Sequence, residues 1–428
     1  EQTKTAIMHY DYMVLAGTQG INNHKKLDRM IDVIRGLKVP LIFFCEGGGG
    51  RPGDVDAGDQ NIAGLNIPSF HDFARLSGEV PLVGIGSGRL FAGNAALLGC
   101  CDVIIGTRDL NLGMGGPAMI EGGGLGVYKP EEVGPTSVQY PNGVIDILVD
   151  NEDDAIVIAK KYLSYFQGNL GSWEAPEVEN LRYVIPENRL EVYDIREVID
   201  NIADIGSVLE IKAGFAKGMF TGFIRVKGKP LGLIANNPLF LAGAIDSDGA
   251  DKASRFIKLC ENYNIPILSL CDTPGMMVGP EIEETGLVRH CCRLFLAGAN
   301  VTVPMMTIVL RKAYGLGAQA MAGGSFMAPQ FVVGWPTAEI GAMGLEGAVK
   351  LGYRKELEAE SDVEKKEKLF KKLVDDLYEK GKAINAASLL EFDTVLDPIE
   401  SRDWISMVVE SPINSSEKVP KNRYIDSW

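Results

Sequence analysis

Short runs of aliphatic residues alternate with longer amphipathic segments along most of the chain. Runs such as 39–46, 80–85 and 303–308 are each followed by glycines or by an acidic residue, and segments of mixed polarity separate them. Continuous Val, Ile and Leu runs are typical of strands buried on both faces, and the amphipathic segments between them are typical of crossover helices. The pattern predicts an α/β protein built on parallel sheets.

The pattern also occurs twice. Placing Leu15 on Leu241, an offset of 226, aligns "LAGTQG" with "LAGAID", and it aligns 39–50 with 265–276. At an offset of 223, "VPLVGI" (80–85) aligns with "VPMMTI" (303–308). Other matched positions are Pro40 with Pro266, Cys45 with Cys271 and Glu46 with Asp272. We therefore expect two tandem domains related by internal duplication.

The expected domains are residues 1–206, ending in a linker at 164–206 rich in Pro and Asn, and residues 207–428. The second contains a charged helical excursion at 354–382, whose Leu369, Leu373 and Leu377 are spaced i, i+4, and whose charges favour a solvated face over a docking site. It also has an upstream hairpin, 221–237, whose first strand has no counterpart in the first copy. Internal symmetry thus predicts that the first domain lacks a strand at its start, as in a fragment of a longer protein.

Charge and cysteine usage narrow the function classes. The net charge of −15 argues against a nucleic-acid-binding surface. Seven cysteines without a C-x-x-C motif indicate a reduced, cytoplasmic protein with no disulfide framework and no zinc ribbon. No apolar stretch approaches the roughly 18 residues of a membrane span. We expect no nucleic-acid partner, no membrane and no metal site.

Two glycine turns are the strongest candidates for chemistry. Gly93 in "RLFAGNAALL" and Gly315 and Gly317 in "RKAYGLGAQAM" follow apolar runs and open helical segments. Unpaired backbone amides at such a turn can hold an oxyanion. No Lys-Ser or Lys-Thr pair completes a phosphate loop, and no G-x-S-x-G motif is present. Glu46 and Asp272 end equivalent strands, where fixing a loop is favoured over acid catalysis.

The motifs of the second copy resemble those of one known family. "CDTPGMMVGPEIEETGLVRHCCRLFLAGANVTVPMMTIVLRKAYGLGAQAM", with "WPTAEIGAMGLEGAV" (335–349) and "FDTVLDPIESRDWI" (392–405), is similar to the carboxyltransferase domain of biotin-dependent acyl-CoA carboxylases. The early segments "YDYMVLAGTQGINNHKKLDRMID" and "EGGGGRPGDVD" look most like the single-chain, multidomain carboxylases of that family. The resemblance covers nearly the whole chain.

This resemblance implies two crotonase-like β-β-α spiral domains and a carboxyl transfer from carboxybiotin to the α-carbon of an acyl-CoA through an enolate. It implies biotin on a carrier domain not present in this chain, a CoA thioester substrate, and a biotin carboxylase and biotin carboxyl carrier as partners. Since such sites form between N- and C-domains of different subunits, it implies a homo-oligomer, from a dimer to a hexamer. The alternatives are a biotin-dependent decarboxylase subunit of the same fold and a catalytically incompetent assembly fragment.

The resemblance also assigns residues. The oxyanion amides fall on Ala92 and Gly93 in the first domain, with Asn94 as the alternate, and on Leu316 and Gly317 in the second, with Gly315 as a further candidate. Gln319 falls at a position that lines the acyl pocket in relatives. The turns after the two acidic residues complete the expected substrate pocket, namely Gly48, Gly49, Thr273, Pro274 and Gly275.

Overall fold

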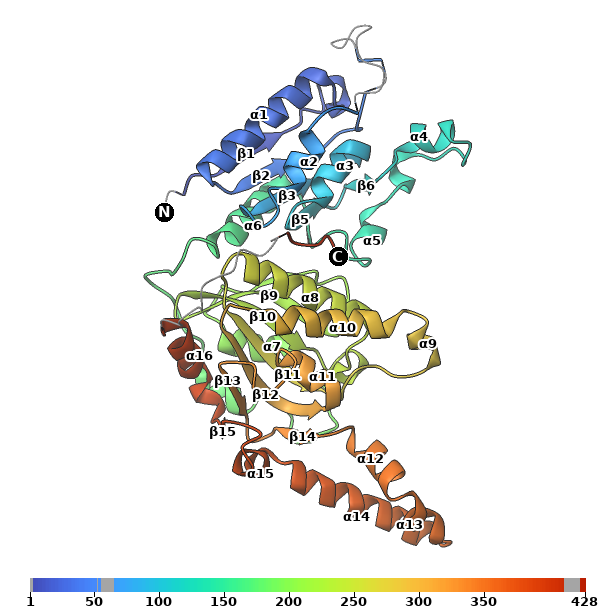
Figure 1. The fold of residues 1–428 in the computed structure, drawn as a ribbon, viewed down its shortest axis with the longest axis vertical. Coiled ribbons are helices and arrows are strands. Elements are labelled where there is room, and N and C mark those ends of the chain that lie inside the picture. The colour runs from blue at the N-terminus through green and yellow to red at the C-terminus, as the bar shows by residue number, and fades with distance from the viewer. Residues whose placement is uncertain (1–2, 52, 55–64, 412–423) are drawn as a thin grey trace. The chain divides into compact units, whose positions relative to one another are not determined.

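The computed structural model describes residues 3–51, 53–54, 65–411 and 424–428. Contacts divide the chain into two compact units (Figure 1). The first unit comprises Glu1–Gly168, Glu210–Phe215 and Val419–Trp428, and the second comprises Asn169–Leu209 and Ala216–Lys418. The contacts thus group 169–209 with the second unit, whereas the domain division after residue 206 stays a prediction. No helix among the described residues is long and apolar enough to cross a membrane.

The first unit is built on a five-stranded parallel sheet of order β1-β2-β3-β5-β7. Its strands are three to five residues long, and β3 and β5 in the middle of the sheet are fully buried. They are β1 (Ala6–His9), β2 (Leu41–Phe44), β3 (Leu82–Gly86), β5 (Val103–Thr107) and β7 (Ile147–Val149), and a second small parallel sheet pairs β4 (Arg89–Phe91) with β6 (Asn111–Gly113).

Helices of the first unit pack on both faces of this sheet. Leu27, Ile31 and Ile34 of α1 lie on one helix face and join the core formed with β2 and β3. Asn151 caps α6 by accepting a hydrogen bond from the Asp154 amide. The helices are α1 (Ile21–Leu37), α2 (Ser69–Ala74), α3 (Ala92–Gly99), α4 (Pro117–Gly122), α5 (Thr136–Gln139) and α6 (Glu152–Ser164).

The second unit contains an eight-stranded sheet of order β15-β13-β12-β11-β10-β9-β8, with β14 paired to β12. β9 and β10 form the expected antiparallel hairpin, and the strands from β10 to β15 pair in parallel. The strands are β8 (Leu209–Ile211), β9 (Met219–Val226), β10 (Lys229–Asn236), β11 (Ile267–Thr273), β12 (Met305–Tyr314), β13 (Phe331–Gly334), β14 (Glu339–Gly341) and β15 (Thr394–Val395). Both units are mixed α/β, which confirms the predicted class.

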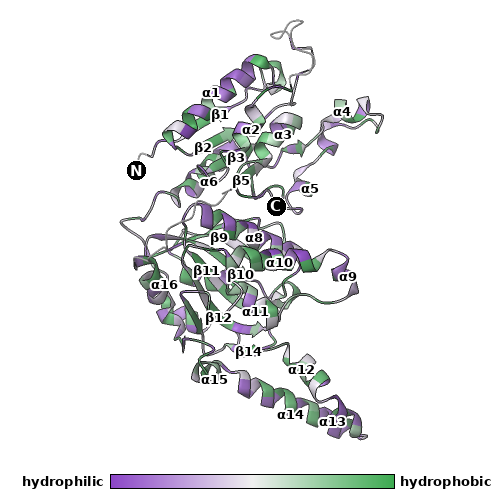
Figure 2. Ribbon diagram, in the orientation of Figure 1, coloured by the Kyte–Doolittle hydropathy of each residue, from purple (hydrophilic) through white to green (hydrophobic). Residues whose placement is uncertain are grey.

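One face of this sheet is covered by α7, which lies in the segment expected as a linker. Ile195, Val198, Ile199 and Ile202 of α7 are fully buried among strand residues. Figure 2 shows the strands of this unit mostly hydrophobic, whereas hydrophilic and hydrophobic residues alternate along α14. The helices are α7 (Ile195–Ile202), α8 (Ser247–Asn262), α9 (Pro280–Glu283), α10 (Leu287–Ala299), α11 (Gly315–Met321), α12 (Leu345–Gly352), α13 (Arg354–Ala359), α14 (Val363–Gly381), α15 (Ala383–Ser388) and α16 (Ser401–Glu410).

The two units repeat each other in backbone geometry, which confirms the internal duplication. β1 pairs with β2 from Ala6 and Leu41, and β10 pairs with β11 from Gly232 and Ile267, so the same register recurs at the offset of 226. The "LAG" tripeptides at 15–17 and 241–243 are both left-handed, with φ between 50° and 86° at all six residues. Such a backbone is costly for Leu and Ala, and its recurrence identifies the same local fold in both copies.

Candidate active site

The first glycine turn joins β4 to α3. Its first helical residue is Ala92, which has a φ of 52°, and Gly93 and Asn94 follow. A side chain at position 93 would meet the Gln19 Oε1 at 2.3 Å, so Gly93 lets the buried Gln19 amide lie against the turn. The first amides of a helix have no carbonyl partner within it. Among the described residues, the amides of Gly93 and Asn94 donate to no side chain and to no loop carbonyl.

The second turn joins β12 to α11 and has the same backbone. Gly315 is the first helical residue and has a φ of 55°, which matches Ala92 at the offset of 223. Leu316 is 62% exposed, whereas Gly317 is buried. The amides of both donate to no side chain and no loop carbonyl in the part of the chain that the structure describes. Each turn therefore contains two adjacent amides that donate to no side chain and no loop carbonyl among the described residues.

The structure also sets the register between the two turns. Since Ala92 is equivalent to Gly315, Gly93 is equivalent to Leu316 and Asn94 to Gly317. The pair Ala92–Gly93 and the pair Leu316–Gly317 are thus one residue out of step. If Leu316–Gly317 is the acting pair in the second unit, symmetry selects Gly93–Asn94 in the first.

The loop after β2 lies directly against the first turn. A Cβ on Gly49 would be 2.9 Å from the Gly93 nitrogen and 2.4 Å from the Ala92 Cβ, so only a glycine allows this approach. Gly49 also has a φ of 82°, which favours glycine independently. Gly48 precedes it, and a Cβ there would be 3.2 Å from the Thr18 Cγ2. The structure therefore brings Gly49 to the predicted amides, with Gly48 beside it in the chain.

The Asn94 side chain holds this loop in place. It is fully buried, and its Nδ2 donates to the carbonyl oxygens of Cys45 (3.1 Å), Glu46 (3.3 Å) and Gly17 (3.3 Å). Its Oδ1 accepts a hydrogen bond of 3.0 Å from the Gly49 amide. One side chain thus fixes the turn, the glycine loop and the "LAG" segment together.

The loop after β11 lies against the second turn in the same way. A Cβ on Gly317 would be 2.7 Å from the Gly275 Cα, so the two glycine backbones are in close contact. The Thr273 hydroxyl donates to the Gly275 carbonyl oxygen and accepts from the Gly275 amide, both at 3.1 Å. Pro274 lies between them and is half-buried. These three predicted pocket residues are therefore neighbours of the second turn.

Asp272 holds a buried polar network under the second turn. Its Oδ2 accepts hydrogen bonds from Arg311 Nε (3.1 Å) and from the Tyr193 hydroxyl (2.8 Å), and its Oδ1 accepts from the Lys312 amide (3.1 Å). Asp272 is fully buried and Arg311 is 2% exposed. Burial lowers the pKa of Lys312 and raises that of Tyr193. With all these donors engaged, the geometry supports a loop-fixing role for Asp272.

A second polar group braces the strand end just before Gly315. The Tyr314 hydroxyl donates to Glu339 Oε1 at 2.7 Å, and Arg189 Nη1 lies 3.9 Å from the same oxygen. Arg189 also forms a 2.7 Å ion pair with Glu346 of α12. Glu339 is 1% exposed, and burial raises the pKa of its carboxyl group. Among the described residues its Oε2 has no hydrogen-bond partner.

A large cleft in the second unit opens at the second turn. It has a volume of about 1060 Å³, and Gly315, Ala318 and Gln319 line one end. Gln319 is exposed to this space, as expected for a pocket residue, although its role stays a prediction. The cleft continues between β14, α12, α14 and residues 390–393. It is large enough for a drug-sized ligand.

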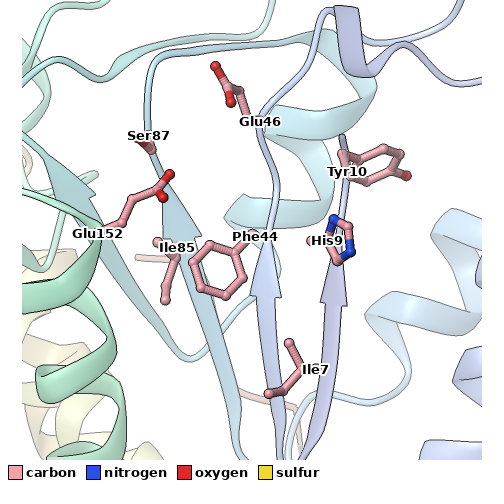
Figure 3. A pocket seen from close by; sticks show the side chains of 8 residues that line it. All are labelled: Ile7, His9, Tyr10, Phe44, Glu46, Ile85, Ser87 and Glu152. Atoms are coloured by element: carbon pink, nitrogen blue, oxygen red, sulfur yellow. The ribbon is translucent and has the colours of Figure 1, made fainter. Parts of the chain in front are cut away.

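A smaller cavity of about 380 Å³ lies at the carboxyl ends of the first unit's strands (Figure 3). Figure 3 shows Ile7 and His9 from β1, Phe44 from β2 and Ile85 from β3, with Glu46 and Glu152 above them. Burial and nearby carboxylates raise the pKa of Glu46. The cavity contains none of the predicted amides, and no group of three or more His, Cys, Asp or Glu among the described residues is arranged to hold a metal.

Sequence reasoning missed three contributors to these turns. Gln19 and Phe70 lie against Gly93, and Glu339 lies behind Tyr314. Gln19 is two residues after the repeated "LAG", so its place was marked by the repeat. No pattern in the sequence marks Phe70, because it comes from α2, which has no clear periodic signal.

Comparison with known proteins identifies the family of this chain. Residues 3–424 match the carboxyl transferase domain family. The chain is 34% identical to the uncharacterized carboxylase YngE of Bacillus subtilis (strain 168), over 94% of this chain and 80% of that protein. It is 32% identical to the methylmalonyl-CoA carboxyltransferase 12S subunit of Propionibacterium freudenreichii subsp. shermanii, over 97% of this chain and 79% of that protein.

Solved structures show the same relationship. A single-chain, multi-domain long-chain acyl-CoA carboxylase superposes with a TM-score of 0.88 and 54% identity over 94% of this chain. The match covers 39% of that carboxylase, so the chain spans about two fifths of its length. The transcarboxylase 12S structure superposes with a TM-score of 0.84 and 30% identity, over 96% of this chain and 79% of that one. The crotonase-like fold is thereby confirmed, and the chain belongs to the carboxyl transferase domain family, the carboxyltransferases of biotin-dependent acyl-CoA carboxylases.

Proposed function

We propose that this chain transfers a carboxyl group between biotin and the α-carbon of an acyl-CoA thioester. The observation that carries the proposal is the pair of equivalent turns, each presenting adjacent backbone amides that donate to no side chain or loop carbonyl among the described residues. Removing the α-proton of a thioester places negative charge on its carbonyl oxygen, and preorganised amides stabilise such a charge. Two turns supply donors for two oxygens.

Each residue then has a definite task. Biotin, delivered by its carrier, supplies the carboxyl group and the nitrogen that takes the α-proton. Leu316 and Gly317 donate backbone hydrogen bonds to one developing oxyanion, and Gly93 with Ala92 or Asn94 donates to the other. Backbone amides can stabilise both developing oxyanions without the help of a charged side chain. Gly48, Gly49, Thr273, Pro274 and Gly275 shape the pocket, because Gly49 and Gly275 pack closely against these turns and the other three adjoin them in the chain.

The relatives support a substrate and a set of partners. The 12S relative is named for methylmalonyl-CoA, and the structure at 54% identity is titled a long-chain acyl-CoA carboxylase. We infer a long-chain acyl-CoA as substrate, and a biotin carboxyl carrier and biotin carboxylase as partners. The hexamer assembly described for the 12S structure supports a homo-oligomer. All seven cysteines are free, which supports the predicted cytoplasmic location.

The test uses two variants at Leu316. One variant deletes the backbone amide, and the control variant shortens the side chain but keeps the amide. Leu316 is exposed and lies in the first turn of α11, where Pro is tolerated, so Leu316→Pro deletes a donor with little change to the fold. Transfer of the carboxyl group from malonyl-CoA to free biotin should fall about a hundredfold. Leu316→Ala keeps the amide and should keep the rate.

Gly317 is less suitable for this test, because a side chain there would collide with the Gly275 backbone. Circular dichroism and sedimentation should show that Leu316→Pro is folded and assembled as the wild type. A wild-type transfer rate in that folded variant would refute the amide assignment. If the wild type itself transfers no carboxyl group from any carboxylated acyl-CoA tested, the result would favour an assembly module over an enzyme.

A further inference from the structure

The charged excursion contributes directly to the large cleft at the second turn. Leu377 and Lys380 of α14 line it, together with Leu345 and Ala348 of α12. Leu377 also packs in the cluster that α12, α13 and α14 form around Tyr314, the residue before Gly315. The excursion is thus anchored to the strand end that carries the turn, and its apolar face forms the far wall of the cleft.

The cleft is lined mainly by apolar side chains, and several remain exposed to it. Met327 is 94% exposed, Leu390 is 87% exposed and Met343 is 41% exposed. Exposed apolar side chains gathered around one hollow mark a binding surface for an apolar group. These three side chains all line the single cleft that begins at the second turn, so they are not isolated surface residues.

The charged side chains at the far end of the cleft disfavour a ligand that carries a phosphate group. Lys380 contributes one positive charge, whereas Glu391 and Asp393 contribute two negative ones. Asp393 is already engaged, because its Oδ2 accepts a 2.7 Å hydrogen bond from the Val332 amide. A phosphate or a nucleotide would be repelled by this balance, and an uncharged hydrocarbon would not.

We propose that the wall built by α12 and α14 binds the distal part of a long acyl chain and sets the chain length that the protein prefers. This inference rests on the proposed function. The thioester would lie at the Gly315–Gly317 turn, and the chain would run past Gln319 toward Leu377 and Leu390. Each methylene group buried along this path should raise affinity about fourfold.

The test narrows the far end of the cleft and leaves the turn unchanged. Ala348→Phe adds a ring at the far wall, and Val363→Phe, at an α14 position that is 71% exposed and does not line the cleft, is the matched control. Transfer to free biotin would be measured with carboxylated acyl-CoA substrates of two, eight and sixteen acyl carbons. In Ala348→Phe we expect kcat/KM for the longest substrate to fall at least tenfold relative to the shortest, and no change of that ratio in Val363→Phe.

A second variant keeps the test decisive if Ala348→Phe does not fold. Leu377→Ala widens the same wall and should shift the preference toward the longest substrate. An unchanged chain-length profile in folded, active variants would overturn the proposal. The proposal would also be overturned if a variant changed its oligomeric state in sedimentation but kept the wild-type chain-length profile. That result would assign the cleft to a subunit interface. Loss of transfer from every substrate in the wild type would instead refute the proposed function.

Discussion

The two units use one backbone turn and hold it with different interiors. In the first unit the buried Asn94 side chain fills the space between the turn and the glycine loop. In the second unit the equivalent residue is Gly317, and the backbone of Gly275 occupies that space directly. What both copies keep is the positive φ at Ala92 and Gly315. The two copies therefore share the direction of the amides, whereas the packing behind the amides has diverged.

The acidic residues under the turns differ in the same way. Asp272 accepts a hydrogen bond from the Lys312 amide, and Glu46 accepts one from the Arg89 amide at the equivalent position. Only Asp272 also pairs with a buried arginine, because the first unit has Gly88 where the second has Arg311. Glu46 remains half-buried at a cavity, and Asp272 is fully enclosed.

Removing Asp272 should therefore produce the largest effect. Asp272→Ala leaves Arg311 as an unpaired buried charge, and breaking a buried ion pair costs about 3–5 kcal/mol. Glu46→Ala removes one hydrogen bond without stranding a charge, and should cost about 1 kcal/mol. Hydrogen exchange read by mass spectrometry would report the two units separately. Exchange should accelerate in the second unit for Asp272→Ala and in the first unit, much less, for Glu46→Ala.

A double variant separates the stranded charge from the lost side chain. Asp272→Leu combined with Arg311→Met should recover most of the stability, since an apolar pair can replace a buried ion pair. If Asp272→Ala cost no more than Glu46→Ala, the contrast between the two acids would be refuted.

The sheet faces provide the next contrast. Ile7 of β1 is 64% exposed, and its counterpart Leu233 of β10 is 1% exposed beneath α7. Leu233→Ala should cost about 3 kcal/mol, as expected for a buried leucine. Ile7→Ala should stay within about 0.5 kcal/mol. Urea unfolding would measure both, and a comparable cost for Ile7→Ala would show that another segment or molecule covers this face in solution.

The smallest effect concerns Glu339, which has no counterpart in the first turn, because Phe91 stands where the second has Tyr314. Burial raises the pKa of Glu339 in the folded protein. The hydrogen bond from Tyr314 and the charge of Arg189 partly offset this rise. The more distant charges of Asp272 and Lys312 have smaller effects of opposite sign on this pKa. A raised pKa means that the stabilisation is present at acid pH and is lost as pH rises through the folded value. Glu339→Gln should therefore gain stability relative to the wild type as the pH rises above the ordinary glutamate pKa of about 4. Thermal melts across this range would test it, and a constant difference would contradict the expectation.

Much of the fold could be predicted because the signals repeat. Leu15 and Leu241 begin the same tripeptide, and the apolar runs that follow each one fall in the same order. Repetition identified the duplication, the parallel strands and the two turns. The family resemblance, rather than the repeat, assigned Gly49 and Gly275 to the substrate pocket, and the structure places both beside the turns.

Other features depended on contacts that a pattern does not encode. The register between the turns was one residue out of step, because it is fixed by the φ of Ala92 and Gly315 rather than by the letters around them. The role of the Asn94 side chain depends on four contacts to distant backbone groups. Helix α7, in contrast, was readable: Ile195, Val198, Ile199 and Ile202 follow helical spacing, and the surrounding Pro and Asn residues obscured it.

The path of the chain has a consequence for how the two copies can change. Residues 210–215 return from the second unit to the first, where Lys212 lies 3.2 Å from Asp146, and the chain's last residues return again, with the Ile425 amide donating to Ser77 at 3.0 Å. Neither unit is one continuous stretch of sequence. A single cut after Gly168 would leave parts of the first unit attached to the other fragment, so the two pieces would stay together. Because each unit is made of separated chain segments, neither unit can be deleted, exchanged or reordered as one contiguous segment.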